Sequence, residues 1–184
     1  MCGIAGLIYK GREANVGSQM TSMLQALKHR GPDSTGYAVY SDGAADEFVM
    51  RIKVAEADDM ASGRGIYAEL ENRISKIDSI LAEYDLTVKD KSKATEYALR
   101  YVIKFNGDLG QLANHIEEVS GTEILSIGNG LELIKDLGDA SNVARAYGLN
   151  SFMGTHGIGH TRMATESDVD IRSAHPYWAF PYND

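Results

Sequence analysis

Cys2 carries the most nucleophilic side chain in the sequence. It is the only cysteine, so one chain can form neither a disulfide nor a site built from several cysteines. Removal of the initiator methionine would give residue 2 a free α-amine beside its thiol. An unperturbed α-amine has a pKa of about 7.7–8.0 and a thiol about 8.5, so the amine can accept the thiol proton. Residue 2 could therefore act as both nucleophile and base, whereas the alternative is an inert cysteine buried in a first strand.

A polar corner occupies residues 29–34, with the sequence His-Arg-Gly-Pro-Asp-Ser. Its glycine and proline restrict the backbone, which predicts a tight turn. Arg30 and Asp33 could brace an adjacent site from this turn. The ordinary alternative is a solvent-exposed turn with no further role.

A glycine-rich stretch over residues 154–165 contains Arg162. Glycines permit close backbone approach, and a guanidinium presents a planar fork that suits a carboxylate, so the stretch predicts a small acidic or zwitterionic ligand. It lacks the Lys-Ser/Thr pair of a P-loop, which argues against phosphate binding. The glycines between His156 and His160 oppose the helix that would bring both imidazoles to one metal, so we expect no metal site.

The segment around His175 is expected to be extended. Pro176 follows His175, and the residue before a proline is pushed out of the helical region. His175 could line a cleft or simply be hydrogen-bonded to its surroundings.

Several elements are expected to position these residues. The apolar run at residues 3–9 predicts a buried strand, and a helix is expected from a cap at Ser18 to a point before Gly31. A short helix should end near Tyr147. Turn-forming dipeptides predict two hairpins, one joining strands 36–40 and 47–53 and the other joining strands 123–127 and 131–135.

The middle of the chain has a helical texture. Apolar residues recur at helical spacing from Ile66 to Tyr84, which predicts a long helix. We expect a second helix over residues 94–105 and a third starting at Asp108. The sequence therefore predicts one domain over residues 1–184, with a helical insertion at residues 56–120.

Composition and charge exclude several classes of protein. The chain of 184 residues is 43% hydrophobic and 24% charged, which is ordinary globular usage. Its net charge of −8 and the lack of basic runs argue against nucleic-acid binding. We find neither an apolar stretch that could cross a membrane nor the order of a signal peptide, so we expect a cytoplasmic protein.

Four motifs together resemble the class II glutamine amidotransferases, which are N-terminal nucleophile hydrolases. Each motif would be weak alone, but all four occur in the family's order. Within the family, residues 125–147 and 155–165 look most similar to stand-alone subunits related to the first domain of glutamate synthase. The motifs are Met-Cys-Gly-Ile-Ala-Gly at residues 1–6, His-Arg-Gly-Pro-Asp-Ser at 29–34, His-Thr-Arg-Met-Ala-Thr at 160–165 and Ala-His-Pro at 174–176.

The resemblance implies a fold and a reaction. The fold would be α+β with four αββα layers, interrupted by the insertion. Mature Cys2 would attack the side-chain amide of glutamine, ammonia would leave, and water would hydrolyse the γ-glutamyl thioester to glutamate. This half-reaction needs no cofactor.

The resemblance also implies roles for further residues and a partner. Arg162 would hold the α-carboxylate of glutamine, with Thr165 and His175 near the substrate and Arg30 and Asp33 supporting the nucleophile. Ammonia would pass to a synthase subunit, most similar to glutamate synthase, and we expect an oligomer. The alternative is a catalytically silent regulatory subunit that binds glutamine or glutamate and docks a partner through the insertion.

The sequence departs from the family pattern near its end. In relatives, a strand with an Asn-Gly pair that forms the oxyanion hole follows the histidine–proline segment, and an acidic residue further on holds the substrate amine. The sequence ends at Asp184 before either feature, and its own Asn-Gly pairs at 106–107 and 129–130 precede Arg162. Loss of one oxyanion donor costs about 10²–10³ in rate, so we expect this chain alone to be weakly active. Glu166 stands where many relatives have histidine.

Overall fold

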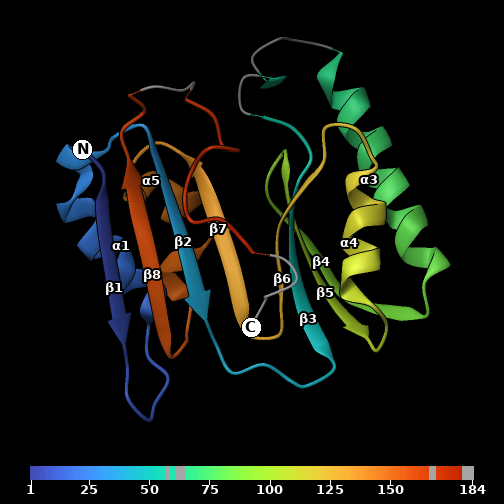
Figure 1. Ribbon diagram of the computed structural model, residues 1–184, viewed down its shortest axis with the longest axis horizontal. Coiled ribbons are helices and arrows are strands. Elements are labelled where there is room, and N and C mark those ends of the chain that lie inside the picture. Colours follow the sequence, from blue (N-terminus) through green and yellow to red (C-terminus); the bar gives the residue numbers. More distant parts are fainter. Residues whose placement is uncertain (57–58, 61–64, 166–168, 180–184) are drawn as a thin grey trace. The chain divides into compact units, whose positions relative to one another are not determined.

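The computed structural model describes residues 1–56, 59–60, 65–165 and 169–179 of the chain. The fold is α+β, with two four-stranded antiparallel sheets and, within the described part, four α-helices (Figure 1). Two compact units divide the chain. The first unit comprises Met1–Asp42 and Gly130–Trp178, and the second comprises Gly43–Asn129 together with Ala179.

The sheet of the first unit has the strand order β1-β8-β2-β7, with every neighbouring pair antiparallel. Helices α1 and α5 lie on one face of this sheet (Figure 1). Two short 3₁₀ helices, η1 (Lys28–Arg30) and η2 (Leu149–Ser151), complete the unit. The bounds are β1 Gly3–Ile8, β2 Ser34–Tyr40, β7 Leu131–Leu137, β8 His156–Arg162, α1 Val16–Ala26 and α5 Ala140–Ala146.

Helix α1 packs closely on this sheet because the strand beneath it has glycines. A Cβ at Gly159 would lie 2.5 Å from Leu24 Cδ1, so a side chain there would push the helix away. Leu24 and Tyr37 are fully buried in the core that results. The helix begins after Asn15, whose side chain accepts from the Ser18 N–H at 2.9 Å. The cap is therefore Asn15, and the expected cap at Ser18 is wrong.

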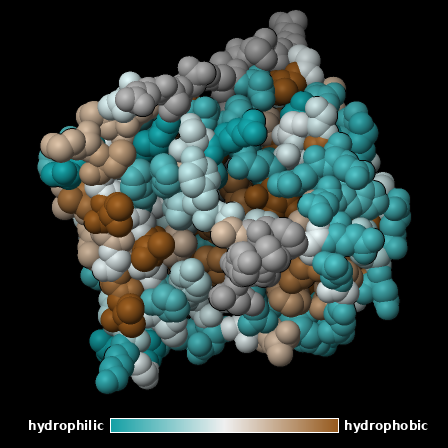
Figure 2. All heavy atoms as spheres, in the orientation of Figure 1, coloured by the Kyte–Doolittle hydropathy of each residue, from teal (hydrophilic) through white to brown (hydrophobic). Residues whose placement is uncertain are grey.

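The opposite face of the same sheet carries an exposed apolar strip along its edge. Ile4, Ile8 and Ile158 are 77%, 81% and 50% exposed. Ile158 stands opposite Gly6 in the β1–β8 ladder, so the three side chains point to one face. Hydrophobic surface is visible over β1 and β8 at the left of Figure 2.

The second unit contains the other sheet, with strand order β4-β5-β3-β6. Helices α3 and α4 lie on one side of it (Figure 1), where the sequence predicts helices, and Asp108 caps α4 as expected. The bounds are β3 Glu47–Lys53, α3 Ile66–Glu83, β4 Leu86–Thr95, β5 Ala98–Phe105, α4 Leu109–Glu117 and β6 Glu123–Gly128. No helix within the described residues is both long enough and apolar enough to cross a membrane.

The helix expected over residues 94–105 is wrong, because this segment lies in strands β4 and β5. The side chains of Leu99, Tyr101 and Ile103 alternate along β5 and are at most 1% exposed. Buried apolar residues that recur every second position, with aromatic and β-branched types among them, are typical of a strand. The same segment also has apolar residues three and four positions apart, which is the spacing that predicts a helix. The region expected to be a helical insertion, residues 56–120, therefore contains a strand pair as well as helices.

Both expected hairpins are also wrong. The strands exist, but β2 pairs with β7 and β8, while β3 pairs with β5 and β6. The two turn sequences instead connect the first unit to the second. Glycine is needed in both links for close approach, since a Cβ at Gly43 would lie 2.0 Å from Asn129 O and one at Gly130 would lie 2.2 Å from Ser41 O.

We expect the α1 interface to dominate the stability of the first unit. Leu24→Ala removes a fully buried side chain and should lower the free energy of unfolding by about 2–5 kcal/mol. Met23→Ala, on the same helix but 39% exposed, is the matched control and should cost much less. Urea denaturation measures both. Equal losses in the two variants would contradict the observed orientation of α1.

Candidate active site

Strand β8 places Arg162 at the same end of the sheet as Cys2. Gly3, the first residue of β1, pairs with Thr161 of β8. Cys2 precedes Gly3 and Arg162 follows Thr161, so both lie one position beyond this last pair. On its other side, Arg162 pairs with Ser34, the first residue of β2. Two motifs that are 160 residues apart therefore meet at one edge through strand register.

Arg30 reaches the backbone of the nucleophile. Its Nε donates to the carbonyl oxygen of Cys2 at 3.2 Å. Arg30 belongs to η1, which leads directly into the turn before β2. The Cys2 side chain is exposed, which contradicts the alternative of a cysteine buried in the first strand. A thiol at this position is open to solvent and to a ligand.

The polar corner holds the end of β8 through three contacts. A Cβ at Gly31 would lie 2.5 Å from the backbone of Thr161 and Arg162, so only glycine lets these segments approach. The Asp33 N–H donates to the Arg162 carbonyl at 3.1 Å. Asp33 Oδ2 in turn accepts from the Ala164 N–H at 2.7 Å. The corner therefore holds the backbone at the end of β8.

Arg162 is only 6% exposed, although it lies at a strand end. Along β8 it shares a face with His160, since side chains two residues apart point to the same side of a strand. This is the face opposite α1, because Gly159, the residue before His160, lies against that helix. The Arg162 side chain therefore lies on the side of the sheet that α1 does not cover.

His175 lies on this face through a close backbone contact. A Cβ at Gly36 of β2 would be 2.0 Å from the His175 carbonyl oxygen, so glycine lets the segment lie directly on the sheet. The His175 ring contacts the rings of His160 and Tyr177, with centroids 4.8 and 4.6 Å away. The side chain is exposed, and it lines the same region as Arg162.

The electrostatics of this region favour neutral imidazoles. Partial burial, together with the positive charges of His175 and Arg162, lowers the pKa of His160. Partial burial, Arg162 and Lys135 lower the pKa of His175. Both rings are therefore poised to stay uncharged, and the fixed positive charge of the region comes from the arginine and the lysine.

Lys135 is a site residue that the sequence interpretation missed. It is 2% exposed on β7, and its Nζ donates to the Arg172 carbonyl at 3.1 Å and lies 5.0 Å from the centre of the Tyr177 ring. Lys135 stands opposite Gly36 in the β2–β7 ladder, close to the His175 segment. A lysine inside the apolar strand sequence Leu-Glu-Leu-Ile-Lys was the available signal, since lysine is rarely fully buried without a reason.

Thr165 is the expected site residue that the structure does not bring into contact with the others. It is exposed, three residues beyond the end of β8, and its side chain makes no hydrogen bond to the described residues. Glu166 lies outside the described part of the chain. Across the described residues, no cluster of three or more histidine, cysteine or carboxylate side chains is arranged to hold a metal ion.

Comparisons with known proteins agree with the motifs. Residues 1–63 match the family model of the glutamine amidotransferase domain. The chain is 35% identical over 183 residues to a provisionally named glutamine amidotransferase of Methanothermobacter thermautotrophicus, a match that covers 98% of this chain and 57% of that protein. It is 32% identical over 179 residues to the glutamine amidotransferase-like protein GlxB of Rhizobium meliloti, covering 96% of this chain and 54% of that protein.

A shorter match involves a different relative. The chain is 41% identical over 51 residues to a glutamine–fructose-6-phosphate aminotransferase of Pyrobaculum aerophilum, covering 28% of this chain and 8% of that protein. The chain is thus similar to glutamine amidotransferases along nearly its whole length. It spans 57% of the length of the Methanothermobacter relative and 54% of the length of GlxB.

We expect Asp33 to hold the backbone after β8. Asp33→Ala removes the acceptor of the Ala164 N–H, which should speed hydrogen exchange at that amide and cost about 1–3 kcal/mol of stability. Hydrogen exchange followed by NMR measures the first effect. Asp42→Ala, an exposed carboxylate of the same unit, is the control. Unchanged exchange at Ala164 in Asp33→Ala would contradict the bracing role.

The lowered histidine pKa values predict a pH dependence of stability. Below the ordinary histidine pKa of 6.5, the unfolded chain takes up protons that folded His160 and His175 resist, so stability should be full above pH 6.5 and fall as the pH drops below it. Denaturation midpoints between pH 8 and 5 measure this slope. His160→Gln should flatten it, whereas the exposed control His29→Gln should not. An identical slope in both variants would refute the assignment.

Proposed function

We propose that the chain is the glutaminase part of a class II glutamine amidotransferase with an N-terminal nucleophile. The observation that carries this proposal is the position of Cys2 and Arg162 together, one step beyond the last β1–β8 pair. A thiol and a guanidinium at one sheet edge suit an amino-acid substrate, with the side chain at the sulfur and the α-carboxylate at the arginine.

The reaction would proceed through a thioester. The Cys2 sulfur attacks the δ-carbon of glutamine while the thiol proton moves to the α-amine of the same residue. That proton then passes to the departing nitrogen, which leaves as ammonia. Water next attacks the thioester carbon and releases glutamate and the thiol.

This chemistry requires removal of Met1. With Met1 attached, the nitrogen of Cys2 is a peptide nitrogen and cannot accept a proton; the methionine amine itself lies 3.2 Å from Met163 Sδ. Arg30 contacts both residues: its Nη2 lies 3.9 Å from Met1 Sδ, and its Nε donates to the carbonyl of Cys2, a contact that does not depend on Met1. Arg30 would therefore keep residue 2 in place after the methionine is gone.

Substrate contacts would come from the face that bears Arg162. Its guanidinium would pair with the α-carboxylate of glutamine, while His175 and Thr165 would lie near the substrate. Lys135 and Arg162 supply positive charge for an anionic group. The two neutral histidines, His160 and His175, add hydrogen-bond donors but no charge. We propose that no cofactor or metal takes part.

The finer parts of the fold and of the assembly belong to this proposal as well. A four-layer αββα arrangement is consistent with two units that each have one sheet and helices on one of its sides. We propose that the chain is one such domain, that residues 56–120 are an insertion in it, and that the whole protein is cytoplasmic and oligomeric. Ammonia would pass to a synthase partner of the glutamate synthase kind.

The experiment is a glutaminase assay on protein whose mass shows the loss of Met1. Cys2→Ala should abolish glutamate release. Arg162→Ala should raise the KM for glutamine about 10- to 100-fold, because a charge-assisted carboxylate contact is lost, while the thiol stays alkylatable. Arg145→Ala, an exposed arginine on α5, is the matched control.

Two results would contradict the proposal. Glutamate release that persists in Cys2→Ala would show that Cys2 is not the nucleophile. An unchanged KM in Arg162→Ala would show that Arg162 does not hold the carboxylate. Glutamine binding that is equal in wild type and Cys2→Ala, with no turnover in either, would instead support a silent binding subunit.

A further inference from the structure

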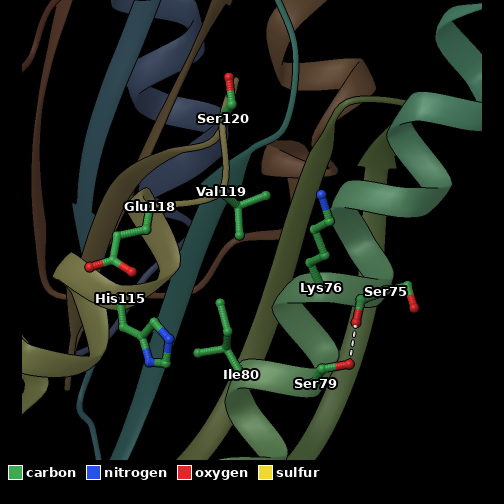
Figure 3. Close-up of a pocket in the computed structure, with 8 residues that line it drawn as sticks. All are labelled: Ser75, Lys76, Ser79, Ile80, His115, Glu118, Val119 and Ser120. Atoms are coloured by element: carbon green, nitrogen blue, oxygen red, sulfur yellow. Dashed lines mark hydrogen bonds between the residues drawn. The ribbon is translucent and has the colours of Figure 1, made fainter.

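The second unit has a pocket between helices α3 and α4. It is an open depression with a volume of about 480 Å³, which is within the range of small-molecule sites. Its floor is apolar, formed by Ile80 and Val119, each only 8% exposed. Polar side chains surround that floor (Figure 3). The polar lining residues are Ser75, Lys76, Ser79, His115, Glu118 and Ser120.

Opposite charges flank the floor. Lys76 projects from α3 on one side and Glu118 lies on the α4 side, with Ile80 and Val119 between them (Figure 3). Neither charged side chain makes an ion pair or a hydrogen bond with the described residues. This differs from nearby charged groups of the same unit, since Arg73 pairs with Glu69 and Lys91 pairs with Asp78. The pocket therefore presents one cation and one anion that are both available to a ligand.

The surroundings of Glu118 strengthen its attraction for a cation. Glu118 follows directly after α4, so the negative end of the helix dipole adds to its attraction for a cation. On the other side, Ser75 and Ser79 lie on α3 with Lys76 and also line the pocket. The Ser79 hydroxyl donates to the Ser75 carbonyl, which leaves Lys76 as the group of this side that can attract an anion.

We propose that this pocket binds a free α-amino acid as a zwitterion. Glu118 would hold the ammonium group, Lys76 the carboxylate, and the apolar floor the aliphatic part of the side chain. A phosphate or a nucleotide fits less well, because Glu118 would repel it and only one lysine lines the pocket. The class of ligand follows from the pocket, whereas the choice of glutamine and glutamate as its members rests on the proposed function.

The consequence is a second amino-acid site, outside the unit that holds Cys2. Every lining residue falls between Gly43 and Asn129. Occupancy of this site would report the level of substrate or product to the protein without involving the thiol. His115, whose Nδ1 lies 3.3 Å from the Tyr84 hydroxyl, borders the pocket and would sense the ligand as a change in its NMR signals.

The test is calorimetric titration of L-glutamine and L-glutamate into protein with the Arg162→Ala background, in which binding at the first site is weakened. We expect saturable binding of at least one of the two, and weak or no binding of N-acetyl-L-glutamine, which lacks the ammonium group. Lys76→Gln and Glu118→Gln should each weaken binding at least about tenfold, as loss of a charged contact implies. The matched controls Lys93→Gln and Glu71→Gln are exposed in the same unit and should bind normally.

Absence of saturable binding by both amino acids would overturn the inference, as would equal affinity in the pocket and control variants. Glutaminase activity with no binding in the Arg162→Ala protein refutes only this second site. Binding that depends on Lys76 and Glu118 in a protein without glutaminase activity refutes only the proposed reaction.

Discussion

The antiparallel pairing of β8 between β1 and β2 is the constraint on which the site depends. It aligns Gly3 with Thr161 and Ser34 with Arg162, so that the N-terminus and the arginine reach the same sheet edge. A slip of one residue would turn the arginine to the face covered by α1, where Gly159 leaves no room for a side chain. Because Gly159 leaves no room for a side chain under α1, the side chains of His160 and Arg162 must lie on the opposite face of the sheet.

Positive charge on that face is held by the fold rather than by solvent-exposed side chains. Arg162 and Lys135 are both at most 6% exposed, and the two neighbouring imidazoles have lowered pKa values. Gly36 and Gly31 let the backbones of the His175 segment and of the polar corner approach the strands directly. Preorganised groups of this kind bind a carboxylate without first having to rearrange, which is how an amino-acid substrate would be oriented.

The parts of this structure that the sequence predicted are those governed by local signals. The long periodic run from Ile66 gave helix α3, and Asp108 marked the start of α4. The failures came from long-range pairing. Asn129-Gly130 is typical of a hairpin turn, but the strands on either side find partners far away in the chain, and no local pattern reveals this. The helix expected at 94–105 failed because Leu99, Tyr101 and Ile103 follow a period of two, which a spacing of three and four obscured. Sequence motifs single out Cys2, Arg30, Asp33 and Arg162 as candidates, and strand register brings Cys2 and Arg162 to one end of the sheet, whereas Lys135 lies in no motif and only its burial reveals it.

The central claim is that a free residue 2 joins a thiol and an amine in front of an amino-acid site. Mass spectrometry of the intact protein, before and after reaction with an electrophilic glutamine mimic, tests it most directly. The account predicts a mass lower by one methionine, then the addition of a single label that peptide mapping places on Cys2 and that excess glutamine suppresses. A chain that keeps Met1, or a label that glutamine does not suppress, would contradict it.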